Sequence, residues 1–142
     1  LLDLQNELQK TIVFITHDLD EALRIGDAIA ILRDGELIQK GTPQSIVLEP
    51  ANDYVADFTK DVNRARVLTL STLSHDSGAK KGLPLDSDLS IEEAMQEMIV
   101  SDHNLVTVMK EGKSIGQVSL NDMVAAIAKP KTTETGASNA YR

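Results

Sequence analysis

Residues 11–22 read TIVFITHDLDEA, and this stretch decides the predicted fold. Residues 11–16 form an unbroken apolar and β-branched run, which is typical of a strand buried on both faces of a parallel sheet. His17 and Asp18 end the run, and an acidic helical pattern follows through residue 26. A buried strand followed directly by a helix predicts an α/β fold. It also places His17 at the carboxyl end of the strand, where open α/β sheets bind their ligands.

His17 has three interpretations on position alone. It can be a structural histidine that packs or caps at the end of the strand. It can be half of a metal site with Glu21, four residues on, but catalytic metal sites need more protein ligands than these two, and His75 and His103 fall in unrelated elements. It can be a polar group that contacts a ligand. The metal interpretation is the weakest, and position does not decide between the other two.

The composition excludes several classes of protein. The 142 residues are enough for one domain or two small ones. Without Cys, the chain has neither disulfides nor thiolate metal sites. No apolar run approaches the roughly 18 residues that a membrane-spanning helix needs, and the acidic start is not a signal peptide. Because the sequence opens in mid-pattern and without Met, we expect it to be part of a longer protein.

The charge is acidic and uneven. The net charge is −8, and residues 1–61 carry −7 of it, since 12 Asp and Glu there face 5 Lys and Arg. Residues 62–142 carry only −1. An acidic chain with no Trp and few other aromatic residues lacks the basic stripe and the stacking platform of nucleic-acid-binding proteins. We therefore expect no nucleic-acid partner.

The first part is predicted to hold one strand, a hairpin and several helices. Leu1, Leu4 and Leu8 have the spacing of the end of an amphipathic helix. The other elements expected here are a helix over 19–25 ended by Gly26, a hairpin of 28–32 and 37–40 that turns at Asp34–Gly35, a helix that begins at Thr42–Pro43, and a helix over 53–59 that buries Tyr54 and Phe58. A boundary is expected near residues 61–65, where the acidic bias ends.

The second part has a different order of elements. Residues 66–70 are a strand candidate, and residues 74–88 are rich in Gly, Ser and charge, as in a loop. Ser90 and Glu93 predict a capping box for a helix whose apolar stripe is Ile91, Ala94, Met95, Met98 and Ile99. A hairpin that turns at Glu111–Gly112 and a closing helix over 121–128 complete it, and the polar tail 129–142 is predicted to be disordered.

The first 60 residues resemble the C-terminal part of an ATP-binding cassette (ABC) transporter ATPase. TIVFITHDLDEA matches the switch-histidine segment of that family, and RIGDAIAILRDGELIQKGTPQSIVLEPAN matches the strand pair and helix that follow it. THDLDEALRIGDAIAIL and PANDYVADFTKDV resemble the ATPase subunits of glycine betaine/proline (osmoprotectant, quaternary amine) importers in particular. The resemblance implies a C-terminal fragment of a P-loop ABC ATPase domain.

This resemblance implies a catalytic role for His17. In the family the switch histidine contacts the γ-phosphate of ATP and helps to position the attacking water, with Mg²⁺ as the metal of the parent enzyme. Asp18 is expected to support the start of the helix. The chain contains no P-loop, because Gly112–Lys113–Ser114 lacks the earlier Gly. The signature loop and catalytic carboxylate would precede Leu1, so the 142-residue chain is predicted not to hydrolyse ATP alone.

Residues 89–127 resemble a single cystathionine-β-synthase (CBS) motif, a small α+β unit. The ribose-contacting pattern of such motifs is matched by Gly116, Ser119 and Asp122, which implies an adenine nucleotide as ligand. Ser119 and Asp122 also fit a variant of the capping box before an apolar run, so a purely structural role stays open. Met95, Met98 and Met109 are expected in the core or on a pairing surface.

The predicted organisation is residues 1–61 as the C-terminal part of the ATPase domain, 62–128 as the CBS-like regulatory motif and 129–142 as the tail. The resemblance implies a second ATPase subunit and a membrane permease as partners, and an extracytoplasmic solute-binding protein as an indirect one. It places the protein at the cytoplasmic face of the plasma (inner) membrane, as a peripheral subunit. The alternative is a stand-alone CBS-type module that binds an adenine nucleotide or dimerises, without catalysis.

Overall fold

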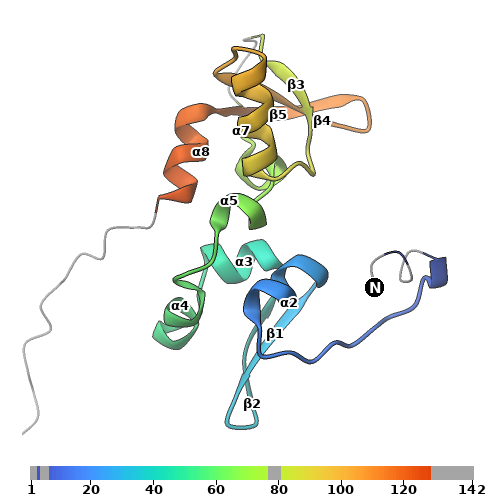
Figure 1. Ribbon diagram of the computed structural model, residues 1–142, viewed down its shortest axis with the longest axis vertical. Coiled ribbons are helices and arrows are strands. Elements are labelled where there is room, and N and C mark those ends of the chain that lie inside the picture. The colour runs from blue at the N-terminus through green and yellow to red at the C-terminus, as the bar shows by residue number, and fades with distance from the viewer. Residues whose placement is uncertain (1–2, 4–6, 77–80, 129–142) are drawn as a thin grey trace, which may run out of the picture.

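The structure, a computed structural model, describes residues 3, 7–76 and 81–128. These residues fold around two hydrophobic clusters (Figure 1). The first cluster lies in the N-terminal part and the second in the C-terminal part, and each has its own small sheet. The fold is α/β, as the sequence predicts.

The first cluster is built on a two-stranded hairpin. Strands β1 (Ile29–Arg33) and β2 (Glu36–Gly41) pair antiparallel. The turn between them is Asp34–Gly35, with φ of 52° and 80°. Two consecutive positive φ angles are those of the two-residue turn that an Asp-Gly pair favours, which confirms the predicted hairpin.

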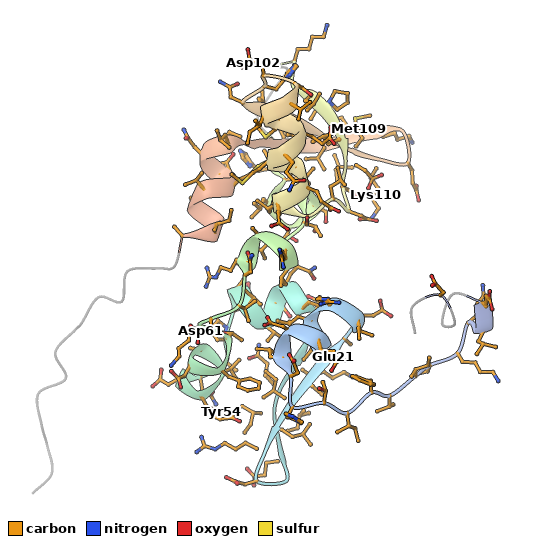
Figure 2. All side chains as sticks on the ribbon, viewed as in Figure 1. Glu21, Tyr54, Asp61, Asp102, Met109 and Lys110 are labelled. Carbon is orange, nitrogen blue, oxygen red and sulfur yellow. The ribbon has the colours of Figure 1, made fainter. Side chains whose placement is uncertain are left out.

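Three short helices pack against this hairpin. They are α2 (Leu19–Ile25), α3 (Pro43–Leu48) and α4 (Asp53–Thr59). Each begins at a residue whose side chain accepts a hydrogen bond from the first turn, as helix N-caps do. Glu21 of α2 and Tyr54 of α4 are labelled in Figure 2. The buried apolar residues of this cluster are Leu23, Ile29, Ile31, Ile46, Val47, Val55 and Val62.

The second cluster is covered by a three-stranded sheet and two longer helices. Strand β3 (Leu83–Asp86) pairs parallel with β4 (Leu105–Lys110), and β4 pairs antiparallel with β5 (Lys113–Ser119). Helix α7 (Ile91–Val100) is the crossover between the two parallel strands, and α8 (Leu120–Ile127) closes the unit. Its buried residues are Leu68, Leu70, Ile91, Ala94, Met98, Val106, Val108, Val118 and Met123.

A short connector joins the two clusters. It contains α5 (Arg64–Val67), followed by α6 (Leu70–Leu73). Val67 packs against the first cluster and Leu68 belongs to the second. Gln44 Nε2 of α3 donates a hydrogen bond to Val67 O over 3.1 Å. The predicted division assigns Val62 to the second part, but Val62 is buried in the first cluster. The division of the chain at residues 61 and 62 stays a prediction.

The predicted strand over residues 11–16 is wrong. This segment is extended but has no regular secondary structure, and Figure 1 shows it running out from α2 with no strand beside it. Val13 is 85% exposed and Ile15 is 91% exposed. A strand buried in a parallel sheet needs a partner strand to hydrogen-bond with its backbone, and among the described residues no strand pairs with it.

Two predictions in the second part are also wrong. Residues 66–70 do not form a strand, because Asn63 accepts a hydrogen bond from Ala65 N and starts α5 instead. The predicted loop over 74–88 contains strand β3, although residues 77–80 lie outside the described part. Pro84 is compatible with this strand, because β3 lies at the edge of the sheet. Proline has no backbone N–H to donate to a neighbouring strand, and an edge strand tolerates its absence.

The predicted burial of Phe58 is wrong as well, because its side chain is 41% exposed. Ile99, at the edge of the predicted apolar stripe of α7, is 77% exposed. The rest of the predicted stripe of α7 is buried or partly buried in the second cluster. The predicted N-terminal helix lies mostly outside the described residues, where only Asp3, Glu7 and Leu8 are assigned as helical, and the predicted disordered tail 129–142 lies wholly outside them.

Candidate functional site

The loop that carries His17 is fixed by its neighbours on both sides. Asp18 caps α2, and its Oδ1 accepts a hydrogen bond from Glu21 N over 3.1 Å. Thr16 Oγ1 accepts from Asp18 N over 3.0 Å and donates to Glu21 Oε2, also over 3.0 Å. These three bonds close a small ring of contacts around the loop. The predicted role of Asp18 at the start of the helix is confirmed.

The His17 side chain is exposed and takes no part in that ring. Within the described part of the chain it makes no hydrogen bond and no ion pair. A structural histidine at a helix start is expected to use a ring nitrogen for capping or packing. Here Asp18 does the capping, and the imidazole of His17 is left open to solvent.

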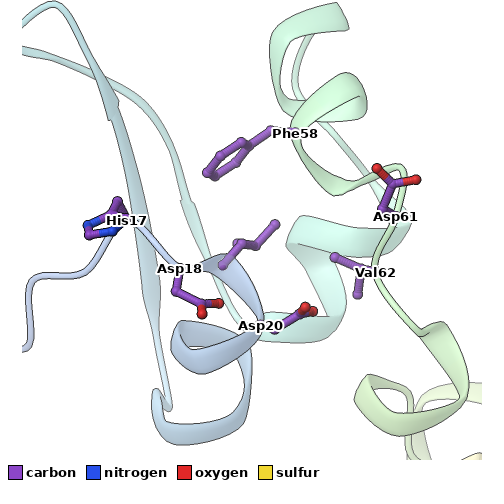
Figure 3. Close-up of a pocket in the computed structure, with 7 residues that line it drawn as sticks. His17, Asp18, Asp20, Phe58, Asp61 and Val62 are labelled. Atoms are coloured by element: carbon purple, nitrogen blue, oxygen red, sulfur yellow. The ribbon is translucent and has the colours of Figure 1, made fainter.

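A shallow, open depression of about 340 Å³ lies beside this loop (Figure 3). One side of it is the loop and the start of α2, and the other side is the end of α4 with the residues that follow. The residues that line it are His17, Asp18, Leu19, Asp20, Phe58, Asp61 and Val62.

The electrostatics of the depression are acidic. Asp18, Asp20 and Asp61 line it, and no Lys or Arg does. Phosphate groups in proteins are held by cationic side chains, by backbone N–H groups and by Mg²⁺. This depression is therefore not itself a phosphate-binding cradle, although His17 at its rim can donate a hydrogen bond to one phosphate oxygen.

The second candidate site is the start of α8, where Ser119 and Asp122 form a reciprocal pair. Asp122 Oδ2 accepts from Ser119 N over 2.8 Å and from Ser119 Oγ over 2.7 Å. Asp122 N donates back to Ser119 Oγ over 3.1 Å. The structure thus confirms the geometry of a complete capping box, which the sequence offered as the structural interpretation.

These contacts also keep the Asp122 carboxylate ionised. The backbone N–H of Ser119, then its hydroxyl, then the nearby His75 lower the pKa of Asp122 below its usual range, against a smaller opposing effect of burial. The same arrangement recurs at α7, where bonds from the backbone N–H and hydroxyl of Ser90 lower the pKa of Glu93. Since Glu93 is no part of the ribose pattern, the box by itself does not indicate a ligand.

Gly116, the first residue of the ribose pattern, has a structural role of its own. Its φ is +154°, and a Cβ built on it would lie 2.9 Å from the carbonyl oxygen of His75. Residues His75 and Gln117 exchange two backbone hydrogen bonds at this point. Glycine is therefore needed here for the close approach of two backbone segments, and this explains it without a ligand.

The sequence interpretation missed the far wall of the depression, which consists of Phe58, Asp61 and Val62. The period of helix 53–59 assigned Phe58 to the core, and only the tertiary arrangement shows that it faces this opening. Among the described residues, no group of three or more His, Asp or Glu side chains is placed to hold a metal ion. The described helices include none that is long and apolar enough to cross a bilayer.

Sequence comparison relates the chain to proteins of known role. It is 59% identical over 73 residues to the glycine betaine/carnitine transport ATP-binding protein of Listeria monocytogenes, a match that covers 51% of this chain and 18% of that protein. It is 40% identical over 129 residues to the glycine betaine transport ATP-binding protein of Bacillus subtilis, covering 86% of this chain and 28% of the relative.

A third relative extends the match through nearly the whole chain. The glycine betaine/proline betaine transport system ATP-binding protein of Salmonella typhimurium is 39% identical over 137 residues, which cover 94% of this chain and 34% of that protein. The chain is homologous to these ATP-binding subunits. No protein-family model matches it.

The homology covers both parts of the chain but only part of each relative. An alignment over 94% of the chain includes most of residues 1–61 and most of residues 62–128. The second part therefore has a counterpart in that relative. The chain itself spans about a fifth to a third of the length of these three proteins.

Proposed function

We propose that this chain is the C-terminal part of the ATP-hydrolysing subunit of an importer for glycine betaine, proline betaine or related quaternary amines. One observation of the structure carries the proposal at the site. His17 is exposed and unbonded within the described residues, on a loop whose other members are fixed by Thr16, Asp18 and Glu21. A rigid loop that presents a free imidazole suits a group that contacts a ligand.

The proposed role of His17 is a hydrogen bond to the γ-phosphate. Phosphoryl transfer depends mostly on positioning and electrostatic stabilisation, and Mg²⁺ supplies part of that stabilisation when ATP is bound. An imidazole N–H can donate a hydrogen bond to a γ-phosphate oxygen. The phosphate cradle must come from outside these 142 residues, because the sequence has no P-loop and the depression has no cationic lining.

The test is ATP turnover by the full-length subunit assembled with its permease in membranes. We expect His17→Ala to lower kcat by about 100-fold, the effect of removing one donor to a transition-state oxyanion. ATP affinity, measured by binding at equilibrium, should change by less than about 3-fold, since other groups hold most of the nucleotide. The control is Arg24→Ala, at an exposed residue of α2, which is the helix that follows the His17 loop; Arg24 does not line the depression. Unchanged turnover in His17→Ala would refute the role.

The same proposal includes the setting of the subunit. It would act as one of two ATPase subunits at the cytoplasmic face of the plasma membrane, bound to a permease and served by an extracytoplasmic solute-binding protein. Residues 62–128 would be its CBS-type regulatory region. The names of the relatives, which are ATP-binding proteins of transport systems, support this setting.

Adenine nucleotide binding at Asp122 is a separate proposal about the second part. The observation in favour is an ionised carboxylate that uses Oδ2 for the capping box, while Oδ1 makes no hydrogen bond within the described residues. Calorimetry with AMP, ADP and ATP on the whole chain tests it. Heat that disappears in Asp122→Asn would support binding, and no heat at millimolar nucleotide would leave the capping role as the whole explanation.

A further inference from the structure

The hydrogen bonds at the start of α2 depart from those at the starts of α7 and α8. At α7, Ser90 N donates directly to Glu93 Oε2 over 2.9 Å, and at α8, Ser119 N donates directly to Asp122 Oδ2 over 2.8 Å. In both helices the accepting acid is the third helical residue, as in an ordinary capping box. Helix α2 also has an acid at this position, Glu21, but the N–H of its cap residue is bonded elsewhere.

At α2 the hydroxyl of Thr16 stands between the cap residue and the acid. Asp18 N donates to Thr16 Oγ1 over 3.0 Å, and Thr16 Oγ1 donates to Glu21 Oε2 over 3.0 Å. The hydroxyl therefore donates its one proton and accepts a hydrogen bond at the same time. Asp18 Oδ1 still accepts from Glu21 N, so the helix is capped without help from Thr16. What the interposed hydroxyl adds is a hold on the residue that precedes His17.

Thr16 is also the one residue among 11–18 that is not exposed. It is half-buried, as is Glu21, to which it donates. The imidazole of His17 makes no hydrogen bond or ion pair within the described part of the chain, so its position is set by the backbone on either side. Asp18 fixes the backbone after His17 through the helix cap, and the Thr16 hydroxyl fixes the backbone before it.

We propose that Thr16 is a positioning residue for His17, and that Glu21 acts through the Thr16 hydroxyl by holding it in place. This inference rests on the proposed role of His17. Phosphoryl transfer depends mostly on positioning and electrostatics, and a misplacement of about 1 Å can cost about 100-fold in rate. Loss of the Thr16 hydroxyl should therefore lower kcat more than it weakens the binding of nucleotide.

The experiment compares Thr16→Val with Thr16→Ser in the full-length subunit assembled with its permease. Valine has nearly the shape of threonine but no hydroxyl, whereas serine keeps the hydroxyl. Turnover is measured per folded subunit, with KM for ATP and Tm measured on the same preparations. We expect Thr16→Val to lower kcat by between about 10- and 100-fold with KM within about 2-fold. Thr16→Ser should keep kcat within about 3-fold of the unaltered subunit, because it keeps both hydrogen bonds.

Thr42→Val is the matched control for loss of a threonine hydroxyl at a helix start. Thr42 caps α3, where its Oγ1 accepts from Ser45 N over 3.2 Å, and it does not line the depression. It should lower Tm, as loss of a helix cap does, and leave kcat per folded subunit unchanged. The double variant His17→Ala with Thr16→Val tests the route of the effect. If Thr16 acts through His17, the double variant should turn over within about 2-fold of His17→Ala.

The outcomes separate the two claims. If His17→Ala loses turnover and Thr16→Val changes only Tm, as Thr42→Val does, the positioning role is overturned and the role of His17 stands. Losses that multiply in the double variant also overturn it, because Thr16 would then act independently of His17. If His17→Ala keeps turnover, the proposed function itself fails.

A second pair of variants decides if Thr16→Val does not fold. Glu21→Gln keeps a side-chain oxygen that can accept from the Thr16 hydroxyl, and Glu21→Ala does not. A lower kcat per folded subunit in Glu21→Ala than in Glu21→Gln supports the inference, and equal kcat in the two overturns it.

Discussion

Gly116→Ala should destabilise the second cluster more than any change at a turn glycine. Gly116 lies in β5 with φ +154°, and the backbone of His75 crosses directly over it. A Cβ added there would lie 2.9 Å from the His75 carbonyl oxygen and 3.2 Å from both its carbonyl carbon and its nitrogen. Because all three contacts are with backbone atoms, no side-chain rotation can relieve them. Gly112 is the matched control: its φ is +75°, and a Cβ there would meet nothing within 4 Å.

The expected magnitudes follow from these contacts. Gly112→Ala places alanine at a left-handed φ without a clash, which costs about 1–2 kcal/mol. Gly116→Ala carries a backbone strain of about 1–3 kcal/mol. It must also push His75 away, which loosens the hydrogen bonds from His75 N to Gln117 O (3.3 Å) and from Gln117 N to His75 O (3.0 Å). Each is worth about 0.5–1.5 kcal/mol, so the total is about 2–6 kcal/mol.

The assay is urea unfolding of the whole chain followed by circular dichroism, since the sequence contains no Trp to report by fluorescence. Amide hydrogen exchange adds a local reading, because the Gln117 N–H should exchange faster in Gly116→Ala and stay protected in Gly112→Ala. If the two variants unfold within about 0.5 kcal/mol of each other, or if Gln117 keeps its protection, then the close approach of His75 is not what requires glycine. Gly116 would then have to be explained by a ligand.

Three further predictions concern other elements. The pKa of Asp122 is lower in the folded state than its usual value. The ionised carboxylate therefore stabilises the fold fully above the usual carboxyl pKa of about 3.9, and this stabilisation is lost as the pH falls through the lowered value. Asp122→Asn should make stability depend less on pH in this range, as measured by acid unfolding followed by circular dichroism between pH 2 and 6. Val13→Lys with Ile15→Lys should reduce self-association of the isolated chain in analytical ultracentrifugation, since both residues belong to an exposed apolar segment; an unchanged sedimentation profile would exclude that segment as the contact. Arg66→Ala removes an ion pair of 3.1 Å to Glu92, but the Arg66 side chain is 67% exposed and that of Glu92 is 39% exposed, so solvent screens the pair. The free energy of unfolding should therefore change by less than about 0.5 kcal/mol in urea titration.

The local signals of the sequence were reliable. Asp34–Gly35 and Glu111–Gly112 turn their hairpins with the positive φ angles that such pairs allow. The capping boxes at Ser90 and Ser119 begin their helices at the predicted residues. In each case the deciding interaction spans no more than four residues, so the sequence contains all of it.

The errors fall where the deciding partner is remote in the sequence. β3 forms because Leu83–Asp86 pairs with β4, more than twenty residues later, and its own composition of Pro, Gly and charge nearby indicates a loop. Phe58 was assigned to the core by helical period. Its place at the depression depends on how α4 lies against α2 and the hairpin, which no period can specify.

The prediction for residues 11–16 fails because it also depends on partners elsewhere in the protein. Their sequence is that of a strand buried on both faces, yet Val13 and Ile15 are almost fully exposed and the backbone pairs with no described strand. A segment with this composition is stable as a strand only when neighbouring strands satisfy its backbone. If the proposed function is correct, those strands belong to the rest of the ATPase domain. In the full-length subunit these strands would also hold the chain that precedes Thr16, so the role of His17 must be measured there.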